Sequence, residues 1–154
     1  MARPDQPADD GPLDPTELAA WRGMLRVHAR VTAILDAQMR EAHGLTVSQY
    51  EVLLFLGDAP DGQMRMADLA SRALLTRSGM TRLVDRLVEL RYVERAAAEG
   101  DGRGAFACLT PAGADALRVA QRTHRRGIRE EFLRKLPQSE QLALGNAWEH
   151  VLRD

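Results

Sequence analysis

The chain has 154 residues, of which 45% are hydrophobic and 28% charged, and this is the composition of a globular protein with one sizeable core. No apolar run approaches the roughly 20 residues that a membrane helix needs, and the polar start "MARPDQPADDGPLDP" has no signal-peptide core. The single cysteine excludes an intrachain disulfide framework and is typical of a reducing cytoplasm, where we expect the protein to act.

The net charge of −1 lacks the basic signature of most nucleic-acid binders, but the acidic residues are unevenly distributed. Residues 1–17 hold five acids and one base, a charge of −4, so the remainder carries −1 − (−4) = +3. Of the 21 basic residues only Lys135 is a lysine. Arginine suits bidentate phosphate contacts, but a GC-rich genome would also produce this bias, so charge alone does not identify a partner.

The first predicted helix begins after Asp14 and ends at His43-Gly44. Asp14 and Glu17 form a capping box around Pro15, and Gly44 is a typical C-terminal glycine. Apolar positions recur at alternating steps of three and four, which predicts a long helix with a broad apolar face. The positions are Leu18, Trp21, Leu25, His28, Thr32, Leu35 and Met39.

Three shorter helices follow. The first begins at Thr46 and is almost entirely apolar, so we expect it to be buried. The second lies in "QMRMADLASRAL", and the third runs from Arg77 to about Arg91 with Thr76 as its N-cap. The last two, joined by "ALLTRS", form a candidate helix-turn-helix. The third buries Met80, Leu83, Val84, Leu87 and Leu90 and exposes Arg77, Ser78, Thr81, Arg82, Asp85, Arg86 and Glu89.

A glycine-rich stretch, "EGDGRGAFACLT", separates two strand-like segments at residues 92–98 and 104–110. The pattern predicts a hairpin just after the helix-turn-helix, which is the position of a wing. Its glycines let the tip approach a surface, so that Arg103 would enter a narrow minor groove, which attracts arginine. We expect Asp101 to hold an arginine in place. A plain surface hairpin with an internal ion pair is the alternative.

The chain continues with a helix of about 25 residues from Pro111 to Leu136, capped by Thr110, and a final helix after Pro137. The first of these is basic and is expected to pair with acids on the first helix or to be solvated. The last helix carries Trp148, Val151 and Leu152, which need cover. Together with the broad face of the first helix, these residues favour a dimer over simple intramolecular packing.

Two blocks, "LTRSGMTRLVDRLVELRYVER" and "DGRGAFACLTPAG", resemble the MarR (multiple antibiotic resistance regulator) family of winged-helix repressors. The second block is similar to the family's D-x-R…L-T-x-x-G wing signature through Asp101, Arg103, Leu109, Thr110 and Gly113. The helix order agrees over about residues 16–154. Many members have a basic or bulky residue between the Asp and the Arg, where this chain has Gly102, which leaves the pose of Arg103 less defined.

The resemblance implies a mainly α winged helix-turn-helix fold and a cytoplasmic homodimer that represses transcription from palindromic double-stranded DNA. The domain plan is a disordered tail at 1–13 and one domain at 14–154, with a DNA-binding lobe at 46–110 and dimerisation helices at 14–44 and 111–154. The expected DNA-binding residues are Thr76, Arg77, Ser78, Thr81, Arg82, Arg86, Asp101 and Arg103. Family members often sense small aromatic or anionic effectors, for which Trp21, His28 and Tyr50 are pocket candidates, although each is more commonly a core residue.

Other chemistries find little support in the sequence. "GDGRG" lies between strands and is no dinucleotide fingerprint, and the four histidines show no metal spacing, so we expect no enzyme activity, cofactor or metal. Cys108 is expected to be a buried structural thiol. Two alternatives to DNA binding remain open, a winged-helix module that binds proteins and a redox sensor that acts through Cys108. The sequence does not define the operator, the regulated genes or the effector.

Overall fold

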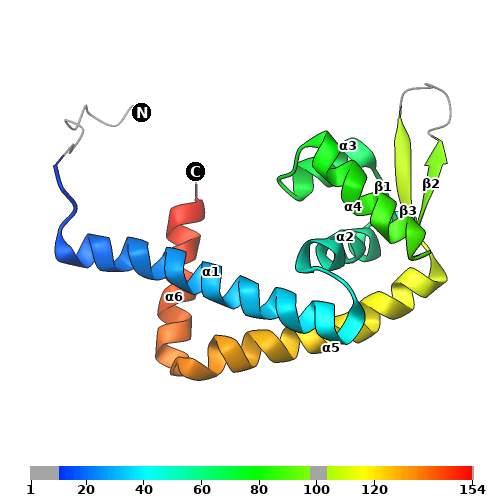
Figure 1. The fold of residues 1–154 in the computed structure, drawn as a ribbon. Coiled ribbons are helices and arrows are strands. Elements are labelled where there is room, and N and C mark those ends of the chain that lie inside the picture. Colours follow the sequence, from blue (N-terminus) through cyan, green and yellow to red (C-terminus); the bar gives the residue numbers. More distant parts are fainter. Residues whose placement is uncertain (1–10, 98–103, 154) are drawn as a thin grey trace. The chain divides into compact units, whose positions relative to one another are not determined.

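The computed structural model describes residues 11–97 and 104–153. The chain divides into two compact units, residues 1–30 and 31–154, and each is described by itself. Figure 1 follows the elements in chain order, which is the predicted order of long helix, three shorter helices, hairpin, long helix and final helix. None of the described helices is long and apolar enough to cross a membrane.

Helix α1 (Pro15–His43) begins with the predicted capping box. One carboxylate oxygen of Asp14 accepts the backbone N–H groups of Thr16 and Glu17, at 2.6 and 2.9 Å, and the Glu17 carboxylate accepts the N–H of Asp14 at 2.8 Å. The helix ends where Gly44 adopts a φ of +65°, as its sequence predicts. In the first unit the apolar face of α1 is open, since Trp21 is 53% exposed.

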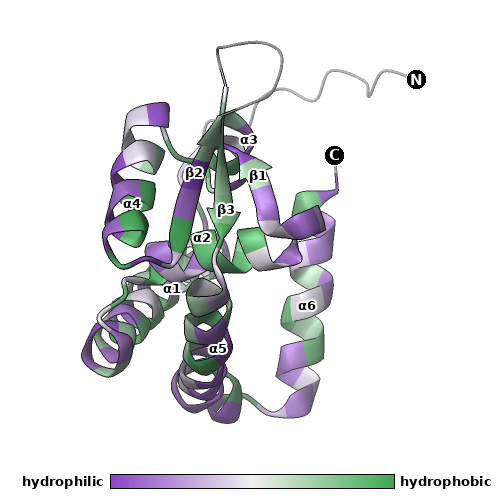
Figure 2. Cartoon of the chain, turned by 90° about the vertical axis from the view of Figure 1, so that its right-hand side faces the viewer, coloured by the Kyte–Doolittle hydropathy of each residue, from purple (hydrophilic) through white to green (hydrophobic). Residues whose placement is uncertain are grey.

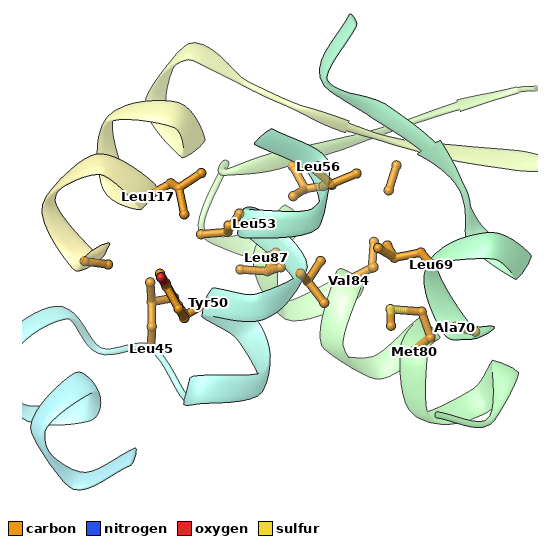
Figure 3. Packing of buried hydrophobic residues seen from close by; sticks show 14 of the residues in the cluster. Leu45, Tyr50, Leu53, Leu56, Leu69, Ala70, Met80, Val84, Leu87 and Leu117 are labelled. Carbon is orange, nitrogen blue, oxygen red and sulfur yellow. The ribbon is translucent and has the colours of Figure 1, made fainter. Parts of the chain in front are cut away.

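The core of the second unit is built by α2 (Val47–Asp58), α3 (Met66–Arg72), α4 (Arg77–Glu89) and the first half of α5 (Pro111–Glu131). Helix α2 lies in the middle, and four of its apolar side chains are buried, which confirms the prediction from its apolar sequence (Figure 3). Ten of the packed side chains are labelled in Figure 3, namely Leu45, Tyr50, Leu53, Leu56, Leu69, Ala70, Met80, Val84, Leu87 and Leu117.

Asp36 joins the C-terminal half of α1 to the start of α2. Its carboxylate accepts from Arg40 Nε at 2.6 Å and from the backbone N–H of Val47 at 2.9 Å. These two hydrogen bonds, the one from Arg40 foremost, hold the pKa of Asp36 below its usual value. Thr46 and Gln49 complete a capping box at the same helix end, so the sharp turn at Gly44 is fixed by side-chain hydrogen bonds.

The sheet has three strands in the order β1-β3-β2, all antiparallel. Strands β2 (Val93–Ala97) and β3 (Ala105–Leu109) are the predicted hairpin. Strand β1 (Gln63–Arg65), which follows the short 3₁₀ turn η1 (Pro60–Gly62), adds to the other edge of β3. The sequence indicated only an extended start here, because three residues are too few to show strand periodicity.

The helix predicted to reach Leu136 ends earlier, at Glu131, and a 3₁₀ turn η2 (Leu133–Lys135) follows. Phe132 leaves helical geometry, with φ −130° and ψ −67°. The side-chain amide of Gln141, on α6 (Gln138–Leu152), donates to the backbone carbonyls of Leu133 and Leu136 at 2.9 and 3.0 Å. These two hydrogen bonds satisfy carbonyls near the end of the chain segment that the last turn of a helix would leave unpaired.

Thr110 and Gly113 fix α5 to the end of α4. Thr110 caps α5 by accepting the N–H of Gly113 at 2.9 Å, and its hydroxyl donates to the carbonyl of Arg91 at 2.8 Å. The Thr110 N–H donates to the carbonyl of Tyr92 at 3.1 Å. A Cβ on residue 113 would collide with that same Tyr92 carbonyl. The L-T-x-x-G part of the sequence signature is therefore a packing requirement.

Replacing Gly113 by alanine should destabilise the protein by about 1–3 kcal/mol, because the added methyl group meets rigid backbone and forces α5 to shift. The matched control is Gly145→Ala on α6, where nothing lies within 4 Å of an added Cβ. In this control the free energy of unfolding should rise by about 0.5–1 kcal/mol, because alanine has a higher helix propensity than glycine. Urea denaturation measures both changes, and equal effects at the two sites would contradict the packing role of Gly113.

Candidate nucleic-acid interface

The N-terminal end of α4 presents short polar side chains and arginines to solvent. Thr76 caps the helix by accepting the N–H of Gly79 at 3.1 Å, and its hydroxyl lies 3.2 Å from that of Ser78. Met80, Val84 and Leu87 hold the opposite face in the core. The expected DNA-facing residues Thr76, Arg77, Ser78, Thr81, Arg82 and Arg86 are all exposed. Their side chains are accessible to a ligand, and their role stays a prediction.

The hairpin lies beside α4 (Figure 2). Its strands are described to Ala97 and from Gly104, so the predicted tip residues Asp101 and Arg103 lie outside the described residues. The first residues after the tip, Gly104 and Ala105, share a pocket with Arg77 and Thr81 of α4. The tip end of the hairpin and the N-terminal end of α4 therefore lie on the same side of the second unit.

That pocket, of about 350 Å³, is lined by three arginines from three different elements. Arg65 comes from the end of β1, Arg77 from the first turn of α4 and Arg95 from the middle of β2. The Arg65 guanidinium also lies over the Phe106 ring, 5.2 Å from its centroid. Three guanidinium groups beside a helix N-terminus make a surface that favours anions. The whole lining is Arg65, Met66, Ala67, Arg77, Thr81, Arg95, Gly104 and Ala105.

Arg95 connects the hairpin to α4. Its guanidinium donates to the Asp85 carboxylate at 2.7 Å and to the carbonyl of Thr81 at 3.4 Å. Sequence reasoning missed this residue and Arg65. A usable signal existed for Arg95, since residues two apart on a strand share a face and Val93 is an obvious core residue. An arginine two positions after a buried valine lies on the helix-facing side, where Asp85 is also exposed.

Arg86 of the predicted set is held by a contact within its own helix. Arg86 pairs with Glu89 at 2.7 Å, and the two side chains are 58% and 64% exposed. Arg86 thus forms an ion pair within α4. Such an exposed pair contributes little to stability, so it leaves Arg86 able to exchange Glu89 for another anion.

Cys108 is not the buried thiol that the sequence led us to expect. It is half-buried on β3, where it is paired in register with Gln63 of β1 and Glu94 of β2. Its Sγ donates weakly to the Gln63 side-chain oxygen at 3.7 Å. Strand alternation accounts for the difference, because the neighbouring Ala107 is fully buried and Cys108 therefore lies on the opposite face of the sheet. Among the described residues, no group of three or more His, Cys, Asp or Glu side chains could hold a metal ion.

The three effector-pocket candidates have different surroundings. Tyr50 is buried in the core, where its ring lies 4.6 Å from that of His124 between ring centroids. Burial raises the pKa of Tyr50 and lowers that of His124, so both groups are held neutral. Trp21 and His28 belong to the first unit and are exposed. The prediction of an effector pocket from these residues stays a prediction.

Two basic side chains, one on α5 and one just after it, form ion pairs with acidic residues of the same helix. Arg118 binds Asp115 at 2.9 Å, and Lys135, just after the helix, binds Glu131 at 2.9 Å. The contact of α1 with α5 in the second unit is close packing at Gly127, where a Cβ would collide with Leu35 and Gln38. His43 and Thr123 add a hydrogen bond of 2.8 Å between the two helices.

A helix-turn-helix with a β-hairpin on the same side as its second helix defines a winged helix-turn-helix protein. A sequence profile of the MarR family matches residues 43–104. Among solved structures, AbsC of Streptomyces coelicolor, a MarR family transcriptional regulator, is 30% identical, with a TM-score of 0.83 over 92% of this chain and 95% of its own. The chain belongs to the MarR family, whose members are DNA-binding transcription factors rather than enzymes.

Two further structures are similar. Sco3205 of Streptomyces coelicolor, a MarR family regulator solved in complex with DNA, is 30% identical with a TM-score of 0.84, over 92% of this chain and 89% of its own. A mutant of MarR from E. coli complexed with operator DNA shares the fold at 22% identity, with a TM-score of 0.77, over 93% and 100% of the two chains. No curated protein sequence matches the chain at comparable significance.

The ion pair between Asp85 and Arg95 should contribute a coupling energy of about 0.3–1 kcal/mol, the usual range for a partly exposed pair. The test is a double-mutant cycle with Asp85→Asn, Arg95→Gln and the combined variant, measured by urea denaturation. Amide exchange in β2 should accelerate equally in all three variants. Additive destabilisation in the combined variant would show that the two side chains do not interact.

Proposed function

We propose that the protein is a repressor that binds a palindromic operator as a homodimer. The observation that carries the proposal is the shared pocket of Arg77 and Thr81 on α4 with Gly104 and Ala105 at the tip end of the hairpin. One face can then engage two adjacent grooves of a duplex. The DNA complex of Sco3205, which is 30% identical over 92% of this chain, supports the same use of the fold here.

In the proposed complex, α4 enters the major groove and the hairpin tip lies over the neighbouring minor groove. Short side chains at Thr76, Ser78 and Thr81 permit close approach, and Arg77 and Arg82 bind guanine edges or phosphates. Arg103 would enter the minor groove with Asp101 orienting a guanidinium group, and Arg86 would contact the backbone. The arginines of the pocket add positive charge on the same face.

The proposed dimer rests on large apolar side chains that a single chain leaves open. On α6 no residue is buried, and Val151 and Leu152 are 73% and 80% exposed. In the first unit, Trp21 and Leu25 are about half exposed. Apolar groups of this size at both ends of the chain favour burial against a second copy. Two-fold symmetry then places two copies of α4 roughly 34 Å apart, one turn of DNA.

Replacing Arg77 by alanine should weaken operator binding about tenfold, because a base or phosphate contact made by arginine is lost. Arg103→Ala should also weaken it strongly. Arg134→Ala, an exposed arginine outside the pocket, is the control and should change little. The probe is a duplex selected by the wild type from a random pool, and affinity is measured by fluorescence anisotropy at several salt concentrations.

For wild type the logarithm of affinity should fall with the logarithm of salt, at about −0.9 per neutralised phosphate. A flat salt dependence would favour the alternative of a winged-helix module that binds proteins. Equal affinities of wild type and the Arg77 variant for the selected duplex would remove α4 from the interface.

Placing charges on the apolar end of α6, by Val151→Asp with Leu152→Asp, should convert the dimer to a monomer, since buried carboxylates without partners are costly. Sedimentation equilibrium measures the mass, and circular dichroism checks that the subunit stays folded. Val88→Asp, which changes an exposed apolar residue on α4 outside the dimerisation helices, serves as the control and should leave the mass unchanged. A double variant that still sediments as a dimer would exclude α6 from the interface.

A further inference from the structure

Leu74, in the turn between α3 and α4, combines two unfavourable properties. It is 92% exposed, more than any other large apolar side chain in the described part of the chain. Its φ is +54°, in the left-handed region that side chains with a Cβ avoid and that glycine adopts freely. Neither property stabilises the fold. An exposed side chain buries no apolar surface, and a positive φ favours glycine over leucine.

The turn itself is held by backbone groups. The N–H of Leu74 donates to the carbonyl of Ser71 at 3.2 Å, and the N–H of Leu75 donates to that of Ala70 at 3.0 Å. Glycine at position 74 would keep both hydrogen bonds and relieve the strain. The isobutyl group of Leu74 is therefore dispensable for making the turn, and its use has to be sought outside the chain.

The position of Leu74 in the chain indicates which group its side chain contacts. Leu74 comes two residues before Thr76, the N-cap of α4, and Arg77 follows on the pocket-lining face. An aliphatic group at this end of α4 cannot bind phosphate. The one apolar group that the base edges present in the major groove is the C5 methyl of thymine, which aliphatic side chains contact in specific complexes.

We propose that Leu74 reads a thymine by packing against its C5 methyl group, which makes it a specificity-determining residue of the interface. This inference rests on the proposed function, since it requires α4 to lie in the major groove. It assigns a base preference to one position of each half-site, beside the bases contacted by Thr76 and Arg77. Glycine would relieve the backbone strain at residue 74 but has no side chain to make this apolar contact.

The experiment is a cycle between protein and DNA. Each thymine of the selected duplex is replaced in turn by deoxyuridine, which removes only the methyl group. Wild type should lose affinity about fourfold at one thymine per half-site, the equivalent of about 0.8 kcal/mol for one methyl group. Leu74→Gly and Leu74→Ala should bind the thymine duplex more weakly than wild type and should not distinguish deoxyuridine from thymine at that position.

Stability separates this role from a structural one. Leu74→Gly should raise the melting temperature or leave it unchanged while DNA affinity falls, whereas a residue needed for folding would lower both. The matched control is Asp61→Gly, which relieves the same backbone conformation at φ 56° in an exposed turn away from the pocket. This control should keep the full sensitivity of wild type to deoxyuridine.

The outcomes distinguish the two levels of the proposal. The proposed role of Leu74 is wrong if wild type binds the selected duplex but loses no affinity at any deoxyuridine. It is also wrong if deoxyuridine lowers the affinity of Leu74→Gly as much as that of wild type. In both cases DNA binding itself still stands. If wild type selects no duplex at all, the proposed function fails and the reading of thymine fails with it. The inference is supported if deoxyuridine lowers the affinity of wild type and of Asp61→Gly but not that of Leu74→Gly or Leu74→Ala.

Discussion

The structure depends on one constraint, that α4 and the β2–β3 hairpin must present their ends on the same side. Apolar packing holds the two elements in this arrangement, since Met80, Val84 and Leu87 of α4 and Val93 of β2 are fully buried in one core. The pair of Asp85 with Arg95 adds a polar link at the surface. Because the core holds both elements against α2, the polar face of α4 and the tip end of the hairpin lie on the same side.

Much of this arrangement follows from local sequence. The capping boxes at Asp14 and Thr46, the glycine that ends α1 and the alternation of the hairpin all give the predicted elements. Such signals act over a few residues, so a single sequence contains them. The exposed and buried faces of α4 were also predictable, because helical periodicity separates the row of Met80, Val84 and Leu87 from the polar row.

What the sequence did not reveal depends on contacts that local patterns do not show. Strand β1 pairs with the free edge of β3, and Gln141 binds the carbonyls of Leu133 and Leu136, after the end of α5. Cys108 is half-buried because it lies on the face of β3 opposite the buried Ala107. In the candidate interface, strand alternation could have pointed to Arg95, but Arg65 was missed because only the tertiary fold brings the end of β1 to the same pocket.

The contact of Thr110 with the end of α4 has a mechanical consequence. The start of α5 is tied by two hydrogen bonds to the carbonyls of Arg91 and Tyr92, and Gly113 allows no gap between them. At the other end of α4, the chain runs directly into the loop that carries Leu74. A tilt of α5 would therefore displace the backbone at the C-terminal end of α4.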